Sequence, residues 1–127
     1  MAETRIILEM GTGNDLYGGD YTKAACRAVQ DALHHSSLVL FKSLGFDHRD
    51  MRVQVTIGVQ RPDLVDLARV AAELPRGRAE VGAVLGGLNV EDSAQGSTHV
   101  IATAAVEAYL PVDAAAWRLS STPGSSA

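Results

Sequence analysis

"MRVQVTIGVQ", residues 51–60, is the stretch that decides the fold. Apolar side chains occupy every second position in it, and mainly polar residues stand between them. A period of two predicts a β-strand with one face on a hydrophobic core. The apolar positions are Met51, Val53, Val55, Ile57 and Val59, and the opposite face carries Arg52, Gln54, Thr56, Gly58 and Gln60.

Helical patterns lie on both sides of this strand. The first begins after Asp20 or Thr22, each a suitable N-cap, and its apolar stripe is Ala24, Ala25, Ala28, Val29, Ala32 and Leu33. These small side chains would let the helix lie close to a sheet. The second is predicted for residues 61–75, between Pro62-Asp63 and Pro75. Its stripe is Leu64, Leu67, Val70, Ala71 and Leu74.

Three further strands are predicted, at residues 4–10, 79–85 and 98–112, with a polar loop at 89–97. The element order is then β-α-β-α-β-β. This order predicts an α+β two-layer sandwich, in which a four-stranded mixed sheet carries both helices on one face. We expect residues 1–118 to form one domain and residues 119–127 a flexible tail.

The sheet face away from the helices carries a mixed set of side chains. Arg52, Gln54 and Thr56 belong to it. Side chains of the last strand point alternately to the two faces, and the sequence does not decide which set lies on this one. The set is either His99, Ile101, Thr103, Ala105 and Glu107 or the residues that alternate with them. Such a face has too few charges for a solvated surface and too many polar groups for a core. It suits a subunit interface, and we expect a homo-oligomer.

Composition limits the functional classes. The 127 residues are 46% hydrophobic, which suffices for one core, and the net charge is −4. Because no basic stripe is present, we expect no nucleic-acid partner. The single cysteine excludes an internal disulfide framework. We read no signal peptide and no membrane-spanning segment, so a cytoplasmic location is expected.

The stretch "GTGNDLYGGD", residues 11–20, is predicted to be a glycine-rich loop between the first strand and the first helix. A dinucleotide fingerprint fails because Leu16 stands where the third glycine is required. A Walker A loop fails because Gly19-Asp20 follows Gly18 where Lys-Ser/Thr is needed. Asp15 and Asp20, the two aspartates of residues 11–20, would also repel phosphate, so no nucleotide cofactor is expected.

The same loop resembles a G-x-G-x-D-x-H-G signature near the N-terminus of a small family of uncharacterised proteins. Gly11, Gly13, Asp15 and Gly18 match that signature, and the likeness extends through "GVQRPDLVDL" and "PRGRAEVGAVLGGL". Tyr17 stands where the family has histidine. Tyrosine titrates about 3–4 pH units above histidine, so Tyr17 does not simply replace a proton-transfer group.

The element order and length are similar to those of the Bacillus-type chorismate mutases. That fold is related to the imine deaminases and to the repeats of cyanuric acid and barbiturate ring-opening amidohydrolases. The resemblance implies a trimer with active sites in clefts between subunits. Because a fold does not determine a function, only the assembly and the place of a site are taken from it.

Asp15 is the candidate acid-base or substrate-orienting carboxylate. Lys23 and Arg27, one helical turn apart, would supply positive charge for a substrate oxygen. The predicted catalytic residues are Asp15 and Lys23, and the predicted substrate-binding residues are Gly11, Gly13, Tyr17, Gly18, Asp20, Arg27, His99 and Glu107. The alternative is structural: glycines supply positive φ, Asp15 forms an Asx turn and Asp20 caps the helix.

The remaining candidates have simpler explanations. His99 and Glu107 would share a strand face without touching, unless a bulge brings them together. Asp47, His48 and Asp50 match no strong metal-ligand spacing, so we expect no metal site. Ordinary structural roles are expected for Ser36, Ser37, Cys26 and Trp117.

These residues support a small-molecule enzyme with acid-base or cyclic-amide and imine chemistry at a subunit cleft. The alternatives are a non-catalytic ligand-binding or assembly protein with a structural glycine loop, and a scaffold partner in a biosynthetic complex. The position of the Asp15 side chain distinguishes the enzyme from the non-catalytic protein. In the enzyme its carboxylate faces a solvent-accessible pocket, whereas in a structural loop the carboxylate is bound by the amides of that loop.

Overall fold

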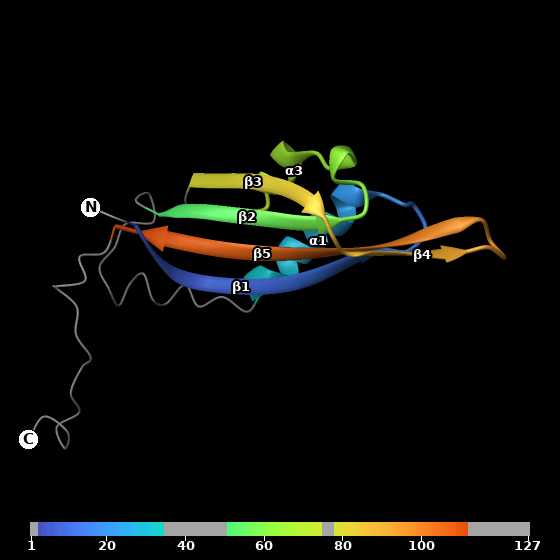
Figure 1. Ribbon diagram of the computed structural model, residues 1–127, viewed down its shortest axis with the longest axis horizontal. Coiled ribbons are helices and arrows are strands. Elements are labelled where there is room, and N and C mark those ends of the chain that lie inside the picture. Colours follow the sequence, from blue (N-terminus) through green and yellow to red (C-terminus); the bar gives the residue numbers. More distant parts are fainter. Residues whose placement is uncertain (1–2, 35–50, 75–77, 112–127) are drawn as a thin grey trace, which may run out of the picture.

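A computed structural model describes residues 3–34, 51–74 and 78–111, and it confirms the α+β class (Figure 1). One mixed sheet lies against one layer of helices. In chain order the elements are β1 (Thr4–Asp15), α1 (Tyr21–His34), β2 (Arg52–Val59), the 3-10 helix η2 (Pro62–Leu64), α3 (Leu67–Ala71), β3 (Arg78–Leu85), β4 (Leu88–Asp92) and β5 (Ser97–Leu110).

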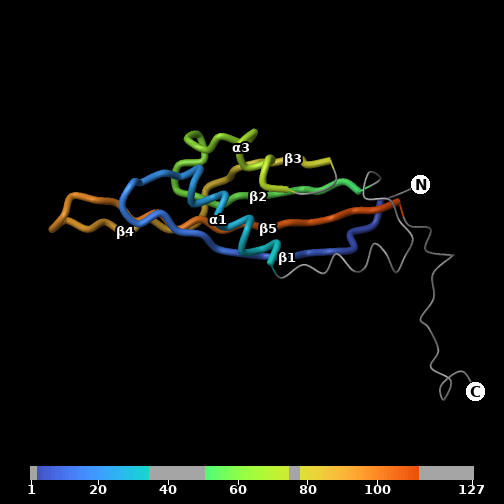
Figure 2. Tube along the Cα trace, turned by 180° about the vertical axis from the view of Figure 1, so that it is seen from behind, coloured from blue at the N-terminus to red at the C-terminus, as the bar shows by residue number. Residues whose placement is uncertain are grey.

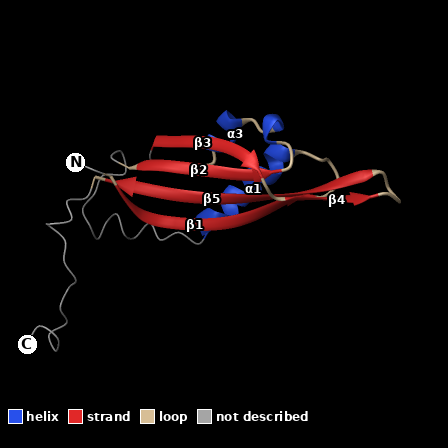
Figure 3. Cartoon of the chain, viewed as in Figure 1, coloured by secondary structure: helices blue, strands red, loops and turns tan. Residues whose placement is uncertain are grey.

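The sheet has five strands rather than the four predicted. The strand order is β1-β5-β2-β3, with β4 paired to β5, and only the β2–β3 pair is parallel. The prediction of a polar loop over residues 89–97 is wrong, because Leu88 and Val90 alternate with polar residues and pair with Ile101 and His99. The resulting β4–β5 hairpin extends past the part of the sheet that the helices cover (Figure 3).

Both helices lie on the same face of the sheet, as predicted. Helix α1 crosses β1 and β5, and α3 lies beside it toward β3 (Figure 2). The predicted stripe of α1 is buried at Ala24, Ala25, Ala28, Val29 and Ala32, and Leu33 is half-buried. No helix in the described part of the chain is long and apolar enough to cross a membrane.

The predicted helix over residues 61–75 is wrong in its extent. It is two short helices, η2 and α3. Val65 has an extended backbone and ends η2, and Asp66 caps α3, because its side chain accepts the Arg69 N–H at 3.2 Å. Val70 is fully buried, but Leu64 and Leu67 of the predicted stripe are exposed.

The prediction of a loop beginning at Gly11 is also wrong, since β1 continues to Asp15. Gly11 and Gly13 lie within this strand and face α1. A Cβ on Gly13 would stand 2.3 Å from the backbone nitrogen of Ala28, and one on Gly11 would stand 2.4 Å from that of Ala32. These two glycines therefore let the backbone of α1 approach the strand, and their role in the fold is close packing.

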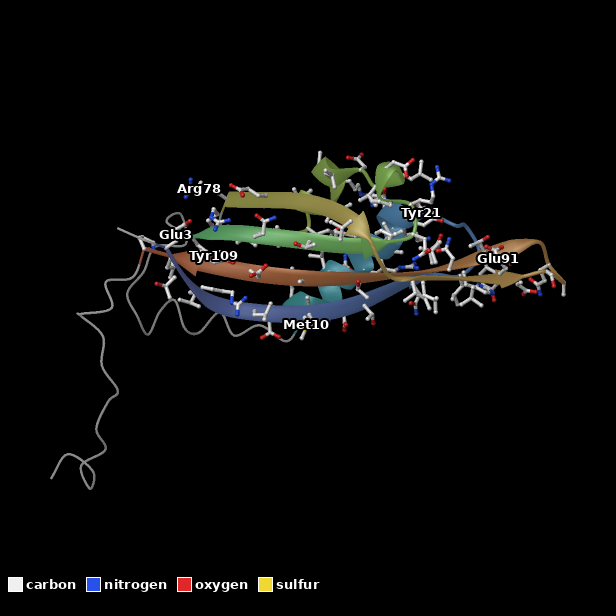
Figure 4. The ribbon with its side chains drawn as sticks, viewed as in Figure 1. Glu3, Met10, Tyr21, Arg78, Glu91 and Tyr109 are labelled. Carbon is white, nitrogen blue, oxygen red and sulfur yellow. The ribbon has the colours of Figure 1, made fainter. Side chains whose placement is uncertain are left out.

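Alternation along β5 separates the core from the open face of the sheet. Its even-numbered residues from Val100 to Leu110 are buried toward the helices. The open face therefore carries the odd-numbered set that includes His99 and Glu107, which settles the choice left open by the sequence. Large apolar side chains are exposed here, among them Met10, labelled in Figure 4, with Leu8, Val84, Leu88 and Val90.

Candidate functional site

Asp15 is the last residue of β1 and is only 5% exposed. Within residues 3–34, 51–74 and 78–111 it is the only buried charged residue. Its Oδ2 atom accepts the backbone N–H of Asp20 at 2.8 Å. One carboxylate oxygen is therefore held by the loop that joins β1 to α1, and a buried charge is partly satisfied by a backbone donor.

The loop over residues 16–20 is shaped by its glycines and by a helix cap. Gly19 has a φ of +60°, which favours glycine. A Cβ on Gly18 would stand 2.9 Å from Asp15 Oδ2. Asp20 caps α1, because its Oδ1 accepts the Lys23 N–H at 3.0 Å, so the N-cap prediction is confirmed for Asp20. Thr22 instead binds residues of the η2–α3 connection.

Two cations reach the other oxygen of Asp15. Lys23 Nζ lies 4.0 Å and Arg27 Nη1 3.8 Å from Asp15 Oδ1. Both side chains start from the outer face of α1 and are about half exposed, at 52% and 47%. Arg27 Nη1 also donates to the backbone oxygen of Asn14 at 2.6 Å, which anchors the guanidinium beside the end of β1. The cations thus have one buried counterion and remain open to solvent.

These groups surround a pocket of about 420 Å³. Its lining brings together six of the ten predicted site residues, Asp15, Tyr17, Gly18, Asp20, Lys23 and Arg27, and adds Leu16. The sequence reasoning missed Leu16 as a wall and the Asn14 carbonyl as an anchor for Arg27. No sequence signal could have found the carbonyl, because any residue supplies one.

Tyr17 connects this pocket to the β4–β5 hairpin. Its ring meets the ring of His99 edge to face, with centroids 5.9 Å apart and planes at 76°. His99 Nε2 lies 3.9 Å from Asp92 Oδ2, and His99 Nδ1 is buried without a hydrogen-bond partner among the described residues. His99 therefore stands behind Tyr17 and does not line the pocket.

Glu107 belongs to a different part of the open face. It pairs with Leu8 and Gln54 in the sheet, and its Oε2 accepts Tyr109 O–H at 2.8 Å and Arg5 Nη1 at 3.1 Å. The Tyr109 hydroxyl, and then Arg5, hold the pKa of Glu107 below its usual value. The structure therefore does not bring Glu107 and Asp15 together.

Gly11 and Gly13 also lie outside the pocket lining, beneath α1. Cys26 is buried on α1, and its burial raises the pKa of the thiol. Ser36, Ser37, Asp47, His48, Asp50 and Trp117 lie outside the described residues. Among the residues described, no group of three histidine, cysteine or acidic side chains is placed to hold a metal ion.

Comparison with known proteins identifies relatives over most of the chain. A crystal structure of an FtsZ-like protein of unknown function from Nostoc punctiforme is 34% identical, with a TM-score of 0.77, and the match covers 87% of this chain and 98% of that one. No curated protein matches. The model of the family described as "Conserved hypothetical protein (Lin0512_fam)" matches residues 5–108. The chain therefore belongs to the Lin0512 family of conserved hypothetical proteins.

Proposed function

We propose that the protein binds a small polar molecule in the Asp15 pocket and catalyses acid-base chemistry on it. One observation carries this proposal: a buried carboxylate has one oxygen fixed by the Asp20 N–H and the other turned toward Lys23 and Arg27 in a pocket. The second oxygen is not fixed by the loop and faces two half-exposed cations, which supports a role for Asp15 beyond the turn.

Asp15 Oδ1 is the proposed general base. It accepts a proton from an N–H or C–H of the substrate, and the electron pair left behind moves onto an adjacent carbonyl oxygen. Lys23 and Arg27 stabilise the negative charge that develops on that oxygen. The reverse transfer, from the protonated Asp15 to another atom of the substrate, completes an isomerisation or prepares a bond for cleavage.

The second candidate is ligand binding without turnover. It is favoured by the hydrogen bond from the Asp20 N–H to Asp15, which gives this carboxylate a structural task in the loop. The packing of Gly11 and Gly13 against α1 points the same way, because it explains two glycines of the signature without a ligand. The two candidates share the pocket and differ in whether a bound molecule changes chemically.

We also propose that the protein is a homo-oligomer, most simply a trimer, which is the assembly implied by the likeness of the predicted element order to the Bacillus-type chorismate mutases. The exposed apolar side chains of the open face support this assembly, since such a surface is costly in water. Leu88 and Val90 continue the apolar face onto the hairpin whose His99 contacts Tyr17. A second copy packed there would stand beside the pocket, and the site would be a cleft between subunits.

A ligand screen by thermal shift on two proteins tests the site. Asp15→Asn keeps an acceptor for the Asp20 N–H and removes the charge, so we expect it to fold and assemble normally. Compounds that stabilise the wild type should not stabilise this variant, and turnover of a true substrate should fall at least ~100-fold. Asp63→Asn is the matched control, because Asp63 is exposed and pairs only with Arg61 among the described residues. A hit that stabilises all three proteins equally would refute the site.

Sedimentation velocity tests the assembly. We expect a trimer at micromolar concentration and a shift toward the monomer in Met10→Glu, which places a charge on the proposed interface. Wild-type protein that stays monomeric at all concentrations would rule out the interface but leave the pocket proposal intact.

A further inference from the structure

We infer that Gly18 is a positioning residue of the proposed site, because its missing side chain leaves the space that the Asp15 carboxylate occupies. The inference rests on the proposed function and deepens it, since Gly18 would act on the substrate only through Asp15. Three observations carry it: the atoms that a Cβ at position 18 would meet, the backbone conformation of Gly18, and the contacts of the two Asp15 oxygens.

A Cβ on Gly18 would collide with the Asp15 carboxylate. Apart from the chain neighbours of Gly18, the three nearest atoms to this Cβ are Asp15 Oδ2 at 2.9 Å, Cγ at 3.7 Å and Oδ1 at 3.8 Å. Gly18 is otherwise exposed, in the lining of the pocket. A side chain at position 18 would therefore compete for space with one group, the carboxylate whose Oδ1 faces Lys23 and Arg27.

The backbone of Gly18 does not require glycine. Among the glycines that the structure describes, Gly19, Gly87 and Gly96 have a positive φ, and Gly18 does not. Gly19 is the opposite case, because its φ is +60° and no atom lies within 4 Å of an added Cβ. The two neighbours are thus glycine for different reasons: backbone conformation at Gly19, and space for the Asp15 carboxylate at Gly18.

An alanine at position 18 would displace the carboxylate more readily than the backbone. Asp15 is held in β1 by its pairing with Val100, whereas its carboxylate ends a side chain that turns about two single bonds. Ordinary contact begins near 3.4 Å, so Oδ2 must move by about 0.5 Å. This movement weakens the 2.8 Å hydrogen bond from the Asp20 N–H and turns Oδ1 relative to the two cations. Because catalytic groups act within about 0.5 Å of their productive positions, the site should lose function while the fold persists.

Carboxyl and amide NMR of the whole protein measures this displacement without a ligand. In Gly18→Ala we expect the side-chain carboxyl resonance of Asp15 to shift. Hydrogen exchange of the Asp20 amide should accelerate at least ~3-fold, because the hydrogen bond that protects this amide is weakened.

A double-mutant cycle separates space for Asp15 from strain in the loop. In an Asp15→Ala background the carboxylate is gone, so adding Gly18→Ala should leave the melting temperature and the Asp20 amide unchanged. Adding Gly19→Ala should lower the melting temperature equally in both backgrounds, since strain at a positive φ does not depend on Asp15. Should Asp15→Ala fail to fold, the Asp15 carboxyl resonance of Gly18→Ala decides the question alone.

The strongest hit of the thermal-shift screen connects this geometry to function. It should bind Gly18→Ala at least ~10-fold more weakly than the wild type. Equal binding, an unmoved Asp15 carboxyl resonance, or an effect of Gly18→Ala that persists in the Asp15→Ala background would each overturn the positioning role. None of these results refutes the proposed function, which fails if the hit binds Asp15→Asn as tightly as the wild type.

Discussion

Replacing Gly13 with alanine tests why the signature glycines are needed. The added Cβ would lie 2.3 Å from the Ala28 nitrogen and 2.4 Å from the Ala24 oxygen, both of them backbone atoms of α1. Ordinary contact begins near 3.4 Å, so the helix must withdraw by about 1 Å. That movement loosens the packing of the apolar side chains of α1 against β1 and β5. We expect a loss of about 3 kcal/mol, at the upper end for overpacked cores.

The assay is urea unfolding at fixed protein concentration, because the proposed assembly makes stability depend on concentration. Gly82→Ala is the matched control: Gly82 also lies in a strand, but no atom stands within 4 Å of an added Cβ. Alanine at position 82 should leave the stability of the fold unchanged or raise it by up to about 1 kcal/mol, because alanine lowers the conformational entropy of the unfolded chain. Equal stabilities of the Gly13→Ala and Gly82→Ala proteins would refute the close-packing role of Gly13.

Three further results are expected. Ala28→Leu should cost about 1–3 kcal/mol in urea unfolding, because Ala28 is fully buried at the centre of the α1 stripe; a neutral result would contradict this packing. Cys26 should resist alkylation at pH 8 in the folded protein and react only on unfolding, since the thiol is buried and its pKa is raised; rapid reaction would contradict this. Tyr109→Phe should raise the pKa of Glu107, measured by carboxyl NMR; an unchanged pKa would show that the hydrogen bond does not matter.

The sign of the Glu107 effect fixes its pH window. Because the pKa of Glu107 is lowered in the folded protein, its interactions stabilise the fold above the unfolded pKa of about 4.3. This contribution is lost as the pH falls through the lower, folded pKa. In Tyr109→Phe the loss should begin at a higher pH, so acid unfolding should also move to a higher pH.

The sequence predicted the elements with strong periodicity and missed those set by tertiary contacts. Strand 51–60 and the α1 stripe were predictable because each pattern repeats without interruption. The position of Gly11 and Gly13 within a strand was not predictable, since glycine has low strand propensity. Only the close approach of α1 explains why glycine stands at these two strand positions. The β4 strand was hidden for a similar reason, because Leu88–Asp92 becomes a strand by pairing with β5.

The candidate site was predicted only where its members are close in sequence. Asp15, Lys23 and Arg27 follow one another across a strand end and the first turns of a helix, so their spacing indicated a shared site. His99 and Glu107 come from the far end of the chain. Their placement depends on the register of β5, which sequence alone left open, and the structure separates Glu107 from the pocket.

Amide chemical-shift mapping of the strongest hit from the thermal-shift screen tests the central claim, that the Asp15 pocket is the functional site. We predict shifts concentrated between Asp15 and Arg27, including the Asp20 amide that donates to Asp15, with none of these shifts in Asp15→Asn. The open face also carries a second pocket of about 570 Å³, whose lining includes Met10, Thr56 and Val84. Shifts confined to that pocket would contradict the account, because they would place the ligand on the opposite side of the sheet from Asp15.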